Sequence, residues 1–187
     1  MTTARPRIAF QGVPGAFSED AVRAFWGPDV TTVPCQSFSA VLAAVRSGAA
    51  DGAVLPVENM VVGPIQSALD ALDDFSDGLT IGATIDVPIV HALLGVPGST
   101  LEQVKLVTSH PVALAQCRRF LQAFGARVEH FFDTAGAAQM VSEKQDRGIA
   151  AVASHNAGTR YGLEILADAI QDDPENWTRF LRIESGR

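Results

Sequence analysis

Short apolar runs alternate along the chain with amphipathic stretches, and this alternation predicts strands separated by helices. Such alternation is typical of βαβ units and favours a largely parallel sheet. The expected strands or extended segments are 7–11, 30–33, 53–57, 79–87, 89–95, 104–107, 127–131, 149–152 and 178–183. The expected helices are 18–26, 37–47, 63–72, 111–124, 133 or 134 to 143, and 154–161, with mixed structure over 162–170.

This rhythm of strands and helices occurs twice, which predicts two α/β lobes within one domain that spans 1–187. Lobe 1 is expected over about 1–87 together with a C-terminal segment of about 174–187, and lobe 2 over about 88–173. In open α/β sheets, ligands bind at the carboxyl ends of the strands. Polar residues directly after predicted strands are therefore the candidates for a site.

Composition excludes several classes of protein. With 47% hydrophobic residues the chain can form a sizeable core, and disorder is excluded. The 14 Lys and Arg against 21 Asp and Glu give a net charge of −7, which argues against nucleic acid as a partner. No membrane-spanning stretch and no signal peptide are evident. Cys35 and Cys117 form no CxxC pair, so we expect reduced cysteines and a cytoplasmic protein.

Two strand ends in the first half carry candidate site residues. The loop from Gly12 to Gly15 follows a strand and opens a helix, a geometry that offers backbone N–H groups to an anion. A plain strand-to-helix turn is the commoner meaning of this pattern. Glu58 and Asn59 end the strand predicted over 53–57. They are candidates for ligand binding, with Asn59 as a cap of the next helix and Glu58 as a loop contact as the alternative.

Two further motifs occupy the second half. Ser109 and His110 precede Pro111 at a predicted helix start, and Gln116 follows within that helix. Ser109 as an N-cap is the simpler interpretation. Thr178 and Arg179 begin the last predicted strand, where a hydroxyl beside a guanidinium suits a substrate with carboxylates.

Other chemistries lack their motifs. The four histidines show no metal-ligand spacing, and neither HExxH nor G-x-S-x-G occurs. No cofactor motif occurs either, so we expect neither a metal nor an organic cofactor. Cys117 fits a buried core thiol better than a nucleophile.

Taken together, the motifs resemble those of prephenate dehydratases. They are GVPGAFSE, PVENMVVGPI, TSHPVALAQC, DTAGAA, AAVASHNAGTRYGL and NWTRF, in this order across about 7–183. The resemblance implies an α/β fold of two lobes like type II periplasmic binding proteins, with the active site in the cleft between the lobes. It implies conversion of prephenate to phenylpyruvate, water and carbon dioxide in L-phenylalanine biosynthesis, without a cofactor. A homodimer is expected from the resemblance and from base rates.

The resemblance also implies roles for particular residues. Asn59, Ser109, Gln116 and Thr178 match active-site positions of the family, and Arg179 completes the TRF motif. We expect Thr178 to donate, or to orient the donor of, the proton for the leaving hydroxyl. The substrate is a dianion, and we expect Asn59, Ser109, Gln116, Arg179, Glu58 and Gly15 to bind it.

The chain departs from the family pattern at two points, and other functions stay open. Met60 stands where the family usually has Ser or Thr, and we favour a tolerated change there. Only seven residues follow Phe180, too few for the phenylalanine-binding ACT domain of many members, so allosteric inhibition by phenylalanine is not expected. Whether that domain is naturally absent or cut off is open. Arogenate dehydratase, prephenate decarboxylase and a solute-binding protein are the alternatives.

Overall fold

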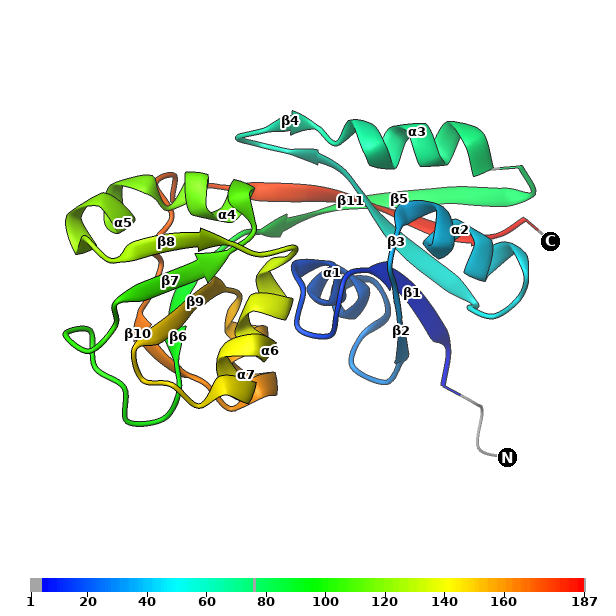
Figure 1. Cartoon of the computed structure of the whole chain (residues 1–187). Coiled ribbons are helices and arrows are strands. Elements are labelled where there is room, and N and C mark those ends of the chain that lie inside the picture. Colours follow the sequence, from blue (N-terminus) through cyan, green and yellow to red (C-terminus); the bar gives the residue numbers. More distant parts are fainter. Residues whose placement is uncertain (1–4, 76, 187) are drawn as a thin grey trace. The chain divides into compact units, whose positions relative to one another are not determined.

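The computed structural model describes residues 5–75 and 77–186, which form two compact units. The first unit comprises Met1–Val13, Phe17–Pro88 and Trp177–Arg187, and the second comprises Pro14–Ala16 and Ile89–Asn176. The interpretation of these units as two lobes of one catalytic domain stays a prediction. Each unit is built around its own sheet (Figure 1).

The first unit holds a sheet with the strand order β2-β1-β3-β11-β5, and β4 pairs with β3 off this path. β1 lies parallel to β2 and β3, whereas β11 is antiparallel to both β3 and β5. The strands are β1 (Arg7–Gln11), β2 (Thr31–Cys35), β3 (Gly52–Asn59), β4 (Gly63–Pro64), β5 (Leu79–Pro88) and β11 (Trp177–Ser185), and the helices are α1 (Phe17–Trp26), α2 (Phe38–Arg46) and α3 (Gln66–Phe75).

The core of the first unit lies on both faces of β3. Ala53 and Leu55 pack into one cluster with buried residues of α2 and α3. Side chains alternate along a strand, so Val54 faces the opposite side of the sheet, and α1 packs against β1 and β3. A strand buried on both faces fits the continuous apolar run in its sequence.

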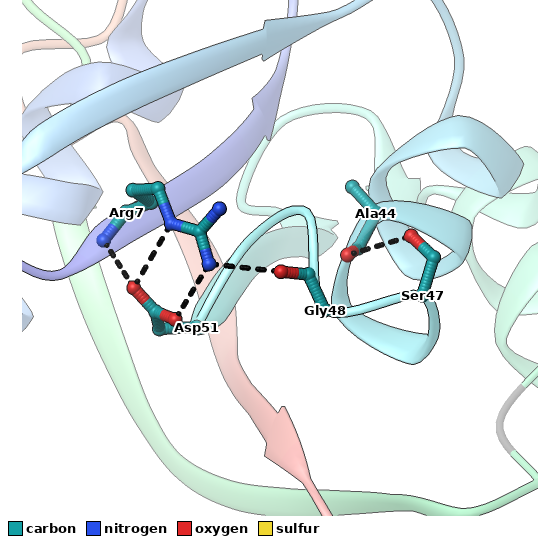
Figure 2. A network of polar contacts seen from close by, with 5 residues as sticks. All are labelled: Arg7, Ala44, Ser47, Gly48 and Asp51. Atoms are coloured by element: carbon teal, nitrogen blue, oxygen red, sulfur yellow. Dashed lines mark hydrogen bonds and ion pairs between the residues drawn. The ribbon is translucent and has the colours of Figure 1, made fainter.

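A polar network ties the end of α2 to the start of β1 (Figure 2). The Arg7 guanidinium donates to Gly48 O at 2.8 Å and to Asp51 Oδ1 at 3.0 Å, and Asp51 Oδ2 accepts from the Arg7 backbone N–H at 2.8 Å. Asp51 raises the pKa of Arg7. Ser47 donates its hydroxyl proton to Ala44 O at 3.2 Å. These contacts fix the turn between α2 and β3.

The second unit holds a sheet with the strand order β10-β6-β9-β7-β8, in which β7 is parallel to β8 and β9. β6 is antiparallel to β9 and β10. The strands are β6 (Ala92–Gly95), β7 (Leu106–Ser109), β8 (Arg127–His130), β9 (Ile149–Ala153) and β10 (Glu164–Ala167), and the helices are α4 (Pro111–Gln116), α5 (Arg118–Phe124), α6 (Thr134–Lys144) and α7 (His155–Tyr161). Leu93, Val107 and Val152 contribute to its core with buried residues of α4 and α5.

The expectation of largely parallel sheets is wrong, because in each sheet only three neighbouring strands pair in parallel and every other pairing is antiparallel. In each sheet the third parallel strand, β3 or β9, has an antiparallel neighbour, β11 or β6. β11 comes from the far end of the chain, and β6 follows directly on the first unit. Strand direction depends on such long-range connections, and hydrophobic periodicity carries no information about it.

Two predicted helices also differ from the structure. The helix expected over 63–72 begins only at Gln66, because Gly63 has φ +84° and pairs with β3 together with Pro64. The helix expected over 111–124 is two helices, since Cys117 between them has φ −112° and ψ 23°. The N-cap predicted at Ser37 is confirmed by the 3.2 Å bond that its hydroxyl accepts from Ala40 N–H.

Candidate active site

In the first unit, the ends of β3 and β11 bring Asn59 and Thr178 together. The two residues are direct register partners, and both are at least nine-tenths buried. Asn59 Nδ2 donates to Thr178 Oγ1 at 3.0 Å and to Trp177 O at 2.9 Å. Because the threonine oxygen accepts this bond, the hydroxyl proton can be directed to another acceptor.

The other end of the Asn59 side chain organises the turn that follows β3. Its Oδ1 accepts from Val61 N–H and Val62 N–H, each at 3.1 Å. Asn59 thus caps the turn into β4, and not the helix that the alternative interpretation assigned to it. The Met60 backbone N–H donates to Trp177 O at 2.9 Å, and the Met60 side chain is 42% exposed. With both ends bonded, the Asn59 carboxamide has a fixed orientation.

Arg179 forms a cluster of charges beside Thr178. Its Nε and Nη2 donate to the two Asp86 oxygens at 2.8 and 2.9 Å, and its Nη1 donates to Glu58 Oε2 at 3.1 Å. The guanidinium carbon lies 4.8 Å from the centre of the Trp177 ring. The hydrogen bonds to Asp86, together with the charges of Asp86 and Glu58, raise the pKa of Arg179, and the hydrogen bonds from Arg179 lower the pKa of Asp86. Arg179 and Glu58, both expected to bind substrate, are therefore ion-paired to each other.

Asp86 is the member of this cluster that the sequence did not indicate. It lies in an extended segment with no polar motif, opposite Arg179 in the β5–β11 register. The only sequence signal is its position as the lone charge in the run LTIGATIDVP.

In the second unit, Ser109 ends β7 and is fully buried. Its hydroxyl donates to Val152 O on the neighbouring β9 at 2.6 Å. The N-cap of α4 is His110, whose Nδ1 accepts from Val112 N–H at 3.2 Å, so the N-cap interpretation of Ser109 is wrong. The Ser109 side chain turns into the sheet because a buried hydroxyl needs a partner there.

Gln116 is the last residue of α4, and it is 9% exposed. Its Oε1 lies 2.9 Å from Nε2 of His91, which is 2% exposed and precedes β6. Burial lowers the pKa of His91, and the bond to Gln116 opposes that shift. The sequence suggested no role for His91, because the histidines show no metal-ligand spacing and its partner Gln116 lies 25 positions away in the chain.

Gly15 belongs to a short loop of the second unit, Pro14–Ala16. Its carbonyl accepts from the Ser154 hydroxyl at 2.8 Å, and Pro14 O accepts from the Tyr161 hydroxyl at 2.6 Å. Gly15 has φ +95°, and a Cβ there would lie 2.9 Å from Ala157 Cα. Close packing against α7 thus explains the glycine, and anion binding by this loop stays a prediction.

The described residues also bear on metal sites and on membrane spans. Within 5–75 and 77–186, no group of three or more His, Cys, Asp or Glu side chains could hold a metal ion. In the same ranges, no helix is long and apolar enough to cross a bilayer. Cys117 is buried, and burial raises its pKa to about 12, which makes it a poor nucleophile at neutral pH.

Two α/β units with buried, hydrogen-bonded polar side chains at strand ends are typical of proteins that bind small molecules. The family model for prephenate dehydratase matches residues 8–187, so the chain belongs to the prephenate dehydratase family. The family resemblance expected from the motifs is confirmed.

Curated relatives include plant enzymes. The chain is 47% identical over 176 residues to arogenate dehydratase/prephenate dehydratase 1, chloroplastic, of Arabidopsis thaliana, covering 94% of this chain and 44% of the relative. It is 44% identical over 179 residues to arogenate dehydratase 1 of Petunia hybrida, covering 95% and 42%. The chain thus spans less than half the length of these relatives.

Solved structures agree on the fold. The prephenate dehydratase of Arthrobacter aurescens in complex with L-Phe aligns with a TM-score of 0.87 at 32% identity, covering 96% of this chain and 60% of that one. A protein described as GqqA, a novel type of quorum quenching acylase, aligns with a TM-score of 0.86 at 41% identity, covering 96% and 64%. The expected α/β fold is confirmed. Taken from β8 to β10, the second sheet repeats the order of the first, with β6 in the place of β11, and this shared order fits the implied type II periplasmic-binding-protein class.

The cytoplasmic expectation is wrong on this comparison, because the Arabidopsis relatives are named chloroplastic. It rested on reduced cysteines and on the lack of a secretory signal. Both features are shared by proteins of several reducing compartments, so they do not distinguish the cytoplasm from a chloroplast.

Proposed function

We propose that this protein catalyses the decarboxylating dehydration of prephenate to phenylpyruvate in L-phenylalanine biosynthesis. The observation that carries the proposal is the buried Thr178 hydroxyl, which accepts a hydrogen bond from Asn59 in a chain of this family. Prephenate and a proton give phenylpyruvate, carbon dioxide and water. The electron pair of the broken C–C bond enters the ring as the C–O bond to the hydroxyl breaks.

The protein's main task in this reaction is to supply a proton to the departing hydroxyl and to hold the substrate in position. Thr178 is proposed as the donor, or as the group that orients it. A threonine hydroxyl is a weak acid in water, and the hydrogen bond from Asn59 stabilises the oxygen as its proton leaves. Asn59 in turn is held by Trp177 O and by the turn amides.

Binding of the dianion is proposed for the remaining candidates. In the second unit these are Ser109, Gln116 and the Gly15 loop, all of which are uncharged. In the first unit, Arg179 and Glu58 enter the proposal as an ion pair, and Asp86 is a second carboxylate partner of the same guanidinium. A guanidinium with two carboxylate partners attracts a further anion less than a lone one does. Its stronger effect is to hold β11 against β3 and β5 beside Thr178.

Arogenate is a second candidate substrate, which the names of the plant relatives support. It differs from prephenate by an amine in place of the side-chain keto group, so the ring chemistry proposed for Thr178 is unchanged. The product is then phenylalanine in place of phenylpyruvate. A homodimer is proposed as the assembly, and light scattering after size-exclusion chromatography tests it.

The acylase name of one structural neighbour suggests a further assay. Acyl transfer by a serine needs a base that takes the hydroxyl proton. Ser109 and Ser154 instead donate their protons to backbone carbonyls, which disfavours this role.

Separate incubations of the purified protein with prephenate, with arogenate and with an N-acyl amide test the proposal. Phenylpyruvate with stoichiometric carbon dioxide from prephenate supports it, and phenylalanine from arogenate alone supports the second candidate instead. A decarboxylated product that keeps the ring hydroxyl, hydrolysis of an N-acyl amide alone, or binding without turnover would refute it.

A further inference from the structure

The imidazole of His91 is a buried titratable group to which the proposed reaction assigns no role. It is 2% exposed, and its Nε2 meets Gln116 Oε1 at 2.9 Å. Gln116 is one of the proposed substrate-binding residues. In the second unit, a buried imidazole therefore contacts the side chain of a proposed binding residue.

The protonation state of His91 follows from its surroundings. Burial lowers its pKa, so the ring is neutral at physiological pH. The Gln116 atom next to Nε2 is Oε1, which can only accept a hydrogen bond, so in this arrangement Nε2 carries the proton of the neutral ring. The other tautomer would pair with a carboxamide turned by half a rotation. The tautomer and the orientation of the carboxamide are thus fixed together.

This orientation has a consequence for binding. A free glutamine carboxamide can turn by half a rotation at little cost, exchanging its oxygen and its NH2 group. The His91 N–H holds the oxygen, which places the NH2 donors at the other end. Prephenate presents carboxylate, keto and hydroxyl oxygens, and a carboxamide oxygen turned toward them would repel the anion.

We propose that His91 is a positioning residue, which fixes Gln116 as a hydrogen-bond donor toward an anionic, acceptor-rich substrate. The identity of that substrate rests on the proposed function. The arrangement selects ligands with an acceptor at this position over ligands with a donor there.

The backbone around His91 is held independently of the ring, which makes the inference testable. His91 N–H donates to Gln171 Oε1 at 3.0 Å, and His91 O accepts from Ile170 N–H at 2.9 Å. Gln116 O accepts from Asp172 N–H. A variant that changes only the ring keeps these backbone bonds.

The central experiment is steady-state kinetics with prephenate on wild type, His91→Phe, His91→Gln, Gln116→Leu and the double variant His91→Phe/Gln116→Leu. His91→Phe keeps a planar ring without the N–H, and we expect KM to rise about 10-fold, the worth of one hydrogen bond to an anion, with kcat little changed. His91→Gln restores a donor and should recover most of this loss. The double variant should be no worse than Gln116→Leu alone.

Other results overturn the inference. A His91→Phe protein with a lower Tm but a normal KM would show a structural role only. Losses that add in the double variant would show that His91 does not act through Gln116.

A substrate-free measurement keeps the test separate from the proposed function. Nitrogen-15 NMR of the wild type should show a neutral His91 ring protonated at Nε2, and His91→Phe should shift the Gln116 side-chain amide signals. If the protein turns over neither prephenate nor arogenate, the proposed function fails while this arm still tests the geometry. An Nδ1-protonated ring, or unshifted Gln116 signals, would refute the inference regardless of activity.

Discussion

Replacement of Thr178 tests the proposed proton donor most directly. Thr178→Val keeps the β-branched shape and exchanges the hydroxyl for a methyl, Thr178→Ala removes both groups, and Thr178→Ser keeps the hydroxyl alone. General acid catalysis is typically worth about 10²–10⁴-fold in rate. Thr178→Val and Thr178→Ala should therefore lower kcat within that range while KM changes little, and Thr178→Ser should keep much of the activity.

The structure sets the stability change that accompanies each variant. In Thr178→Val, Asn59 Nδ2 loses the 3.0 Å acceptor but keeps the 2.9 Å bond to Trp177 O. The loss of this hydrogen bond from a buried N–H costs about 1–3 kcal/mol, and the retained bond favours the lower end. For a chain of this size, 1 kcal/mol corresponds to about 2–4 °C in Tm. Thr178→Ser loses one methyl group, worth about 0.8 kcal/mol.

The assay combines phenylpyruvate formation with thermal melting of each variant. A catalytic hydroxyl predicts that Thr178→Val is slow although nearly as stable as Thr178→Ser. If Thr178 is purely structural, Thr178→Val should have a normal kcat per folded molecule, and its turnover should fall only with the folded fraction. Near-normal kcat in Thr178→Val would refute the proposed role.

Three further variants or treatments follow from the contacts. Ser109→Ala removes the 2.6 Å bond to Val152 O and should lower the free energy of unfolding by about 1–3 kcal/mol, which denaturant titration measures. If Ser109 also binds substrate, kcat/KM should fall by more than the unfolded fraction of the variant explains. Arg179 lowers the pKa of Asp86, so this ion pair stabilises the fold fully above about pH 4, the ordinary pKa of the carboxyl group. The stabilisation is lost as the pH falls through the lower pKa that Asp86 has in the folded protein. Asp86→Asn should therefore flatten the acid side of the Tm–pH curve, and an unchanged curve would contradict it. The raised pKa of Cys117, about 12, predicts that a maleimide modifies it only after unfolding, as mass spectrometry can check.

The local elements could be predicted because their signals lie within a few residues. The strand at 7–11 and the Ser37 N-cap were placed correctly, since a cap satisfies N–H groups two or three positions ahead. The break at Cys117 carried no comparable signal, because neither glycine nor proline marks it. Strand direction was missed for β11 and β6, whose partners lie far away in sequence.

The candidate site was predictable to a smaller extent. The motifs named Asn59, Thr178 and Gln116, and the structure places the first two in contact. The hydrogen-bond and ion-pair partners of the site residues could be identified only from the structure. Asp86 reaches Arg179 across 93 positions, and no local pattern marks an acid as the partner of a particular guanidinium.

Each residue of the TRF motif, Thr178 to Phe180, has its own physical role in β11. Successive side chains of a strand point to opposite faces, so Thr178 and Arg179 act on different sides of β11. Thr178 is buried against Asn59, whereas Arg179 ties β11 to β3 through Glu58 and to β5 through Asp86. The register with β3 shifts directly after Arg179, and Phe180 is 2% exposed. An irregularity beside a polar site re-aims side chains at the cost of regular pairing. The ion pairs and the buried ring anchor the strand on either side of that irregularity, which fixes the position of the Thr178 hydroxyl.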